Sequence, residues 1–151
     1  MKILLYISLL LGIALLPTEA TDVGELIPVE VIAVSEERGI IYVETDTGDK
    51  GQGNTLEEAF GDMELTSPGI IYLDTAEYLL IEEGMEKHLN RLRPYLKESV
   101  RVCKAARGIP LEGIAKYLSI HKPDSRLNEV MDISEIPVVV EENGRYEIKE
   151  K

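Results

Sequence analysis

The chain alternates short runs of β-branched apolar residues with segments in which apolar residues recur at helical spacing. The runs 27–34 and 40–45 are typical of strands, and the polar stretch Ser35–Gly39 between them predicts the turn of an antiparallel hairpin. Five further apolar runs predict strands, at residues 70–73, 78–81, 99–104, 137–140 and 145–148.

A helix is expected after the first hairpin. Residues 46–53 contain three glycines and two aspartates, which predict a loop. Thr55 and Glu58 then form a capping box, in which the hydroxyl and the carboxylate satisfy free backbone N–H groups. The apolar face of this helix consists of Leu56, Ala59, Phe60 and Met63, and the helix ends at Ser67-Pro68-Gly69.

A second helix is expected before Pro94, which would end or kink it. Its apolar face consists of Met85, Leu89 and Leu92. A continuous helix over 75–92 is the alternative to a strand at 78–81, and Gly84 argues against that helix.

A third helix is expected to begin at Pro110, because proline suits the first helical position. Its apolar positions are Leu111, Ile114, Ala115 and Leu118. Further on, Asn143-Gly144 favours a type I′ turn between the last two strands. The pattern predicts an α/β domain, with α+β as the alternative, in which a mixed sheet with terminal hairpins packs against about three helices.

The first twenty residues have the layout of a secretory signal peptide. Lys2 supplies a positive charge, and residues 3–16 form an apolar run that Pro17 ends. The small residues Thr18 and Ala20 predict cleavage after Ala20. We therefore expect a signal peptide over residues 1–20, a short tail over 21–26 and a single domain over 27–151.

This leader predicts export across the cytoplasmic membrane, to a secreted or envelope-associated location. An uncleaved N-terminal anchor is the alternative, but a spanning helix needs about 20 apolar residues. The run over residues 3–16 has only 14. No stable membrane insertion is expected after cleavage.

The charge balance excludes some classes of partner. Asp and Glu number 28 against 16 Lys and Arg, for a net charge of −12. This excess repels nucleic acid and anionic lipid, so neither is an expected partner. The negative charge would attract a cationic partner or a divalent metal. The ordinary explanation of such an excess of acidic residues is that it increases solubility.

Candidate metal ligands occur around the glycine-rich loop. The carboxylates of Glu44, Asp46 and Asp49 are hard oxygen ligands of the kind that Ca²⁺ prefers. Their spacing departs from the EF-hand pattern, and the loop also lacks the spacing of a phosphate-binding P-loop. Acidic residues in turns have an ordinary structural explanation, so we expect no cofactor.

No sequence motif indicates catalysis. H-E-x-x-H, G-x-S-x-G and paired-cysteine motifs are absent from the sequence. Cys103 is the single cysteine, which excludes a disulfide within the chain, and we expect it to be buried in a strand. His88 and His121 lie far from Cys103 in sequence, and we expect no catalytic residue.

The order of elements resembles the N-terminal domain of the C subunit of bacterial spore germinant receptors. The residues that carry the resemblance are Gly53–Phe60, the apolar run Ile70–Leu73 and the second run Tyr78–Gly84. The resemblance implies a non-enzymatic fold of this kind over about Val29 to Val140. The chain differs in lacking the lipid-accepting cysteine of those subunits, and we do not expect the further domains into which those subunits continue.

These features favour an exported, non-catalytic module that interacts with envelope- or spore-associated proteins. An exported protein that binds a small ligand or Ca²⁺ through Asp46–Gly53 is the alternative, and a small extracellular hydrolase is a further one.

Overall fold

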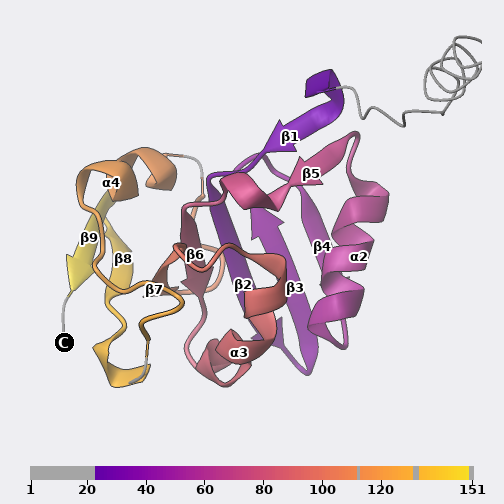
Figure 1. The fold of residues 1–151 in the computed structure, drawn as a ribbon. Coiled ribbons are helices and arrows are strands. Elements are labelled where there is room, and N and C mark those ends of the chain that lie inside the picture. Colours follow the sequence, from indigo (N-terminus) through magenta and orange to yellow (C-terminus); the bar gives the residue numbers. More distant parts are fainter. Residues whose placement is uncertain (1–22, 112, 131–132, 150–151) are drawn as a thin grey trace, which may run out of the picture.

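The computed structural model describes residues 23–111, 113–130 and 133–149, in which seven strands form a mixed sheet (Figure 1). The strand order is β4-β3-β2-β6-β7-β8-β9. Neighbours from β2 to β8 are parallel, whereas β4-β3-β2 and β8-β9 are antiparallel. A separate parallel pair joins β1 to β5. The strands are β1 (Leu26–Pro28), β2 (Val31–Glu37), β3 (Ile40–Thr45), β4 (Lys50–Gly53), β5 (Ile70–Tyr72), β6 (Tyr78–Ile81), β7 (Arg101–Ala105), β8 (Val138–Glu142) and β9 (Arg145–Lys149).

Three α-helices accompany the sheet in the described part of the chain, and the expected mixed α/β single domain is confirmed. They are α2 (Leu56–Thr66), α3 (Leu89–Leu92) and α4 (Ile114–Ile120). Short 3₁₀ segments are η1 (Val23–Glu25), η2 (Leu73–Thr75), η3 (Met85–His88), η4 (Arg93–Tyr95) and η5 (Ile133–Glu135). None of the helices among these residues is long and apolar enough to cross a membrane. The expected signal peptide at 1–20 lies outside the described residues, and residues 23–26 of the expected tail form η1 and the start of β1.

The first hairpin is confirmed, but its turn is shorter than expected. β2 continues to Glu37, which pairs with Ile40 of β3. Only Arg38 and Gly39 form the turn, with φ of 53° and 83°. A two-residue type I′ turn requires positive φ at both positions, so the predicted five-residue turn was too long. The strand expected over 27–34 is instead divided between β1 and β2.

The predicted loop at 46–53 is wrong in its second half, which forms β4 under helix α2 (Figure 1). A Cβ atom at Gly51 would lie 2.1 Å from the Ala59 carbonyl oxygen, and one at Gly53 would lie 2.4 Å from Glu58 Cβ. The glycines are therefore needed for close packing of a strand against a helix, which is a recognised use of glycine within strands.

The outer edge of β4 is closed by side chains of α2. The Asp62 carboxylate accepts a hydrogen bond from the Gln52 backbone N–H at 2.9 Å. The Thr66 hydroxyl donates to the Lys50 carbonyl oxygen at 3.1 Å. Exposed sheet edges promote unwanted pairing with other chains, and these two contacts satisfy backbone groups on this edge.

The start of α2 is confirmed. The Thr55 hydroxyl accepts a hydrogen bond from the Glu58 N–H at 3.2 Å. The Glu58 carboxylate reaches the Asn54 N–H at 2.7 Å, one residue before the expected partner. The four predicted apolar positions are buried, and they are Leu56, Ala59, Phe60 and Met63.

The alternative helix over 75–92 does not form, because β6 is a fully buried strand between β2 and β7. Gly84 follows β6 with φ of 94°, a left-handed conformation that favours glycine. The helical stretch after it is divided into η3, α3 and η4, and the three predicted apolar residues Met85, Leu89 and Leu92 are buried.

The third helix begins later than predicted. Pro110 precedes α4 by four residues and is not its first residue. Gly113 is the N-cap, with φ of 84°, a left-handed conformation that favours glycine. Of the four predicted apolar positions, Leu111, Ile114 and Leu118 are buried and Ala115 is half-buried. The hairpin turn at Asn143-Gly144 is confirmed, with φ of 55° and 74°, and the remaining predicted strands agree to within about two residues at each end.

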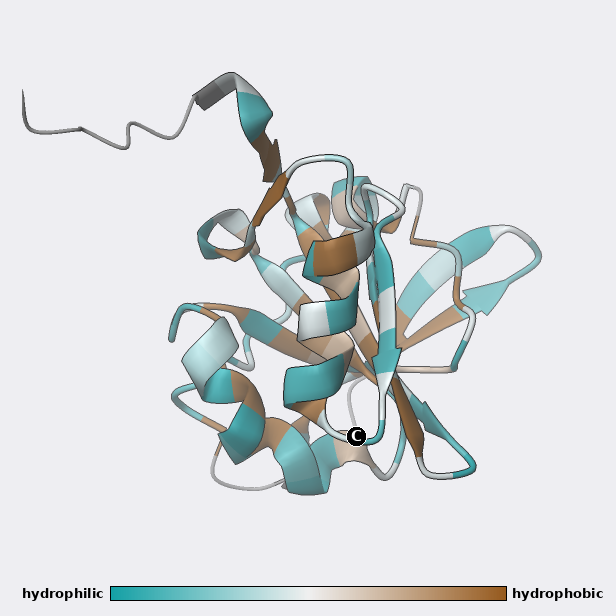
Figure 2. Ribbon diagram, turned by 90° about the vertical axis from the view of Figure 1, so that its right-hand side faces the viewer, coloured by the Kyte–Doolittle hydropathy of each residue, from teal (hydrophilic) through white to brown (hydrophobic). Residues whose placement is uncertain are grey.

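The sheet has two faces with separate cores. The first face packs against α2 and α3, with Phe60 and Met63 among the buried residues. The second face packs against α4, which contributes Ile114 and Leu118. Apolar residues concentrate along the central strands in Figure 2. In the described part of the chain, the second face is covered by one short helix, α4, whereas α2 and α3 both cover the first, and the second face has a cavity.

Candidate functional site

A cavity of about 250 Å³ lies on the second face, at the carboxyl ends of the parallel strands β2, β6 and β7. We call it the sheet groove. The uncharged residues that line it include Ala33, Ser35, Tyr42, Leu80, Ala105 and Ile109.

Strand register explains why these residues share one face. Ala33 of β2 lies opposite Leu80 of β6, and Ser35 lies opposite Tyr42 of β3. Directly opposed residues project to the same side of a sheet. The β2 residues Ala33 and Ser35 have small side chains, so this part of the face stays hollow where larger residues would have filled it.

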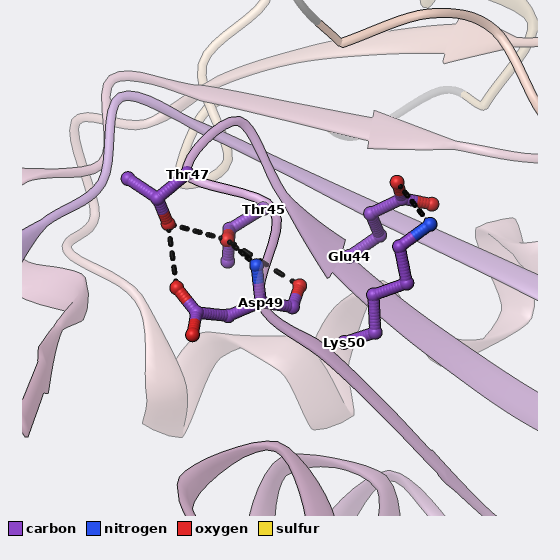
Figure 3. A network of polar contacts seen from close by, with 5 residues as sticks. All are labelled: Glu44, Thr45, Thr47, Asp49 and Lys50. Atoms are coloured by element: carbon purple, nitrogen blue, oxygen red, sulfur yellow. Dashed lines mark hydrogen bonds and ion pairs between the residues drawn. The ribbon is translucent and has the colours of Figure 1, made fainter. Parts of the chain in front are cut away.

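Two ion pairs flank the sheet groove. Lys50 Nζ lies 2.8 Å from Glu44 Oε1 across β3 and β4 (Figure 3). Arg107 Nη1 lies 2.9 Å from Glu37 Oε2 and connects the loop after β7 to the end of β2. All four side chains are at least two-fifths exposed, so each pair contributes little stability.

A second cavity of about 590 Å³ adjoins the sheet groove. Both cavities are lined by Glu82 and by residues 105–107. Lys104, which also lines the second cavity, forms an ion pair with Glu86 at 2.8 Å. Burial by itself would raise the pKa of Glu86, but the hydrogen bonds from Lys104 and from the Gly84 N–H outweigh it and lower that pKa.

The predicted metal candidates are not assembled into one site. Asp46 Oδ1 accepts hydrogen bonds from the Glu30 and Val31 N–H groups, both at 3.1 Å. Asp49 Oδ2 accepts one from the Thr47 hydroxyl at 2.7 Å (Figure 3), and Glu44 pairs with Lys50. Within the described ranges, no group of three or more His, Cys, Asp or Glu side chains could hold a metal ion.

Cys103 lies in β7 and is fully buried, as predicted. Burial raises the pKa of its thiol to about 12, which keeps it protonated and unreactive at neutral pH. His88 is largely buried, and burial together with the charges of Lys87 and Arg91 lowers its pKa. His121 is exposed at the end of α4, where its ring lies 4.5 Å from that of Tyr117.

Apart from Glu44, and from Lys50 and Gly51 of the candidate binding loop 46–53, none of the residues of the sheet groove was predicted from the sequence as part of a site. They come from five strands, β2, β3, β4, β6 and β7, and from the segments that follow β6 and β7. One signal in the sequence could have indicated the hollow. Ala33 and Ser35 are small residues at alternate positions of one strand, and the intervening residues Ile32 and Val34 are bulky and β-branched. No protein-family model, curated protein or solved structure matches this chain.

Proposed function

We propose that this protein is an exported, non-catalytic module that binds another envelope- or spore-associated protein through the sheet groove. The observation that carries the proposal is the hollow, partly apolar floor of the second face, flanked by exposed ion pairs. Protein interfaces commonly combine an apolar centre with a polar rim, and this arrangement fits that description.

The polar groups at the groove support binding rather than catalysis. The carboxylates of Glu37 and Glu44 are held by cations, and the Glu82 carboxylate accepts a hydrogen bond from the Glu36 N–H at 3.0 Å. A nucleophile that hydrogen-bonds to a base is the usual arrangement for covalent catalysis, and the contacts at this groove are ion pairs and backbone hydrogen bonds instead.

Site-specific photo-crosslinking tests the proposal in the cells that produce the protein. In one variant a benzophenone amino acid would replace Tyr42, which lines the groove. In the matched control it would replace Tyr72 on β5, which is 41% exposed and lies outside the groove. We expect a discrete adduct from position 42 and none from position 72. The captured protein would then be purified and titrated against the wild-type chain and against Ser35→Trp, which fills the groove.

Loss of affinity in Ser35→Trp, with an unchanged melting temperature, would support the groove as the binding site. The proposal would be overturned by an adduct at position 72 alone, by no adduct at either position, or by equal affinity of the purified partner for both chains.

A further inference from the structure

The charges around the two adjoining cavities do not cancel. Their three cations are Lys50, Lys104 and Arg107. Each is already neutralised by a carboxylate at 2.8 to 2.9 Å, and those partners are Glu44, Glu86 and Glu37. The cations of this region are therefore committed to internal pairs.

Two carboxylates at the same place have no such partner. Glu82 lines both cavities, and the exposed Glu83 lines the second. Neither forms an ion pair within the described residues. Glu82 keeps one oxygen on the Glu36 N–H, and a carboxylate can accept further hydrogen bonds with its remaining lone pairs. The junction of the cavities is therefore a focus of negative charge.

The apolar floor adds a second requirement for the occupant. Ala33, Leu80 and Ala105 line the groove beside Glu82, so a cation that enters must be accompanied by aliphatic surface. Lysine and arginine side chains meet both conditions, because their long apolar stems carry a terminal charge. Two cavities that share a wall also suit an extended chain segment that crosses from one to the other.

We infer that the sheet groove receives a lysine or arginine side chain, flanked by aliphatic residues, from an extended segment of the partner protein. The inference rests on the proposed function and names the chemistry of the partner. Complementary charge would favour such a segment over neutral and acidic ones and would speed its association, which the net charge of −12 also favours.

Three matched peptides test the inference directly, by titration of the isotopically labelled protein followed in amide NMR spectra. The first is acetyl-Gly-Leu-Lys-Val-Gly-amide, and the other two carry norleucine or glutamate in place of lysine. We expect the lysine peptide to shift the resonances of groove residues with a Kd about tenfold lower than that of the norleucine peptide, with the glutamate peptide weaker still. The preference should decrease as salt is added.

Two double variants separate the local charge from the charge of the whole protein. Glu82→Gln with Glu83→Gln removes the carboxylates at the junction and keeps an acceptor oxygen for the Glu36 N–H. Glu57→Gln with Glu64→Gln makes the same change in charge on the exposed side of α2, which packs on the other face. The first pair should abolish the preference for lysine, and the second should leave it intact.

Equal binding of the three peptides, loss of the preference in both double variants, or no shift of groove resonances at millimolar lysine peptide would each overturn the inference. Crosslinking from position 42 would still report separately on whether the groove binds a partner protein. A failure of the inference can therefore be distinguished from a failure of the proposed function.

Discussion

The Lys104 ammonium on β7 lies 2.8 Å from the Glu86 carboxylate in η3, and each side chain is only 10% exposed. This pair connects the carboxyl end of a central strand to the helical stretch that precedes that strand in the chain. Removal of one member of a buried pair leaves the other charge uncompensated and costs about 3–5 kcal/mol.

Lys104→Met should therefore lower the free energy of unfolding by about 3 kcal/mol, the lower end of that range, because the pair keeps some contact with solvent. Urea denaturation measures the change. Lys149→Met is the matched control, since its ion pair with Glu142 is 2.7 Å long but exposed to solvent, so its loss should have little effect on stability. Equal costs would mean that burial of the Lys104 pair has no energetic consequence.

The same pair predicts a dependence of stability on acid. The pKa of Glu86 is lowered in the folded state from its usual value of 4.5. The stability that ionised Glu86 contributes is therefore fully present above its unfolded-state pKa of 4.5. It is lost as the pH falls from 4.5 through the lower folded-state pKa. We expect Glu86→Gln to be destabilising at pH 7 and to flatten the acid limb of the stability curve. Parallel curves for wild type and variant between pH 7 and 3 would contradict this assignment.

Two glycines should respond in opposite directions to alanine. Gly51→Ala places a Cβ atom 2.1 Å from a backbone carbonyl oxygen of α2, and we expect a cost of about 3 kcal/mol through displacement of the helix from β4. Gly61 lies within α2 with no atom in reach of an added Cβ, so Gly61→Ala should stabilise by about 0.5–1 kcal/mol. Thermal unfolding of both variants measures the contrast, and a tolerated Gly51→Ala would refute the close contact.

The hydroxyl of Tyr78 is buried and has no hydrogen-bond partner among the described residues, and burial, with a contribution from Glu77, raises its pKa. Tyr78→Phe removes an unsatisfied polar group, and we expect it to stabilise the fold by about 1 kcal/mol. Tyr117→Phe is the control, because the Tyr117 hydroxyl accepts a hydrogen bond from the Ile148 N–H at 3.1 Å, and its loss should destabilise. A Tyr78→Phe variant as unstable as Tyr117→Phe would show that the Tyr78 hydroxyl has a partner.

Cys103 should react slowly with an aromatic disulfide reagent in the native protein and rapidly in denaturant. The folded chain buries the thiol completely and raises its pKa to about 12, so both access and thiolate formation are suppressed. Absorbance of the released thiolate at pH 8 gives the two rates. Rapid labelling of the native protein would place the thiol at the surface.

The sequence by itself determined the features whose interacting residues lie only a few positions apart in the chain, such as helix caps and hairpin turns. Thr55 caps α2 through the N–H of Glu58, and Asn143-Gly144 forms the last hairpin turn. Both depend on conformational preferences of adjacent residues, which are the same in any fold.

The tertiary structure decided the roles that depend on residues distant in the chain. Gly51 belongs to a strand because α2 lies against it, and Asp46 satisfies the N–H groups of Glu30 and Val31, which were not foreseeable as its partners. The sheet groove joins Ser35, Tyr42 and Arg107, which meet only once β2, β3 and β7 have taken their places on the second face. Side-chain alternation places a residue on a face of its strand, but the order of strands and the length of the covering helix decide which part of that face stays open.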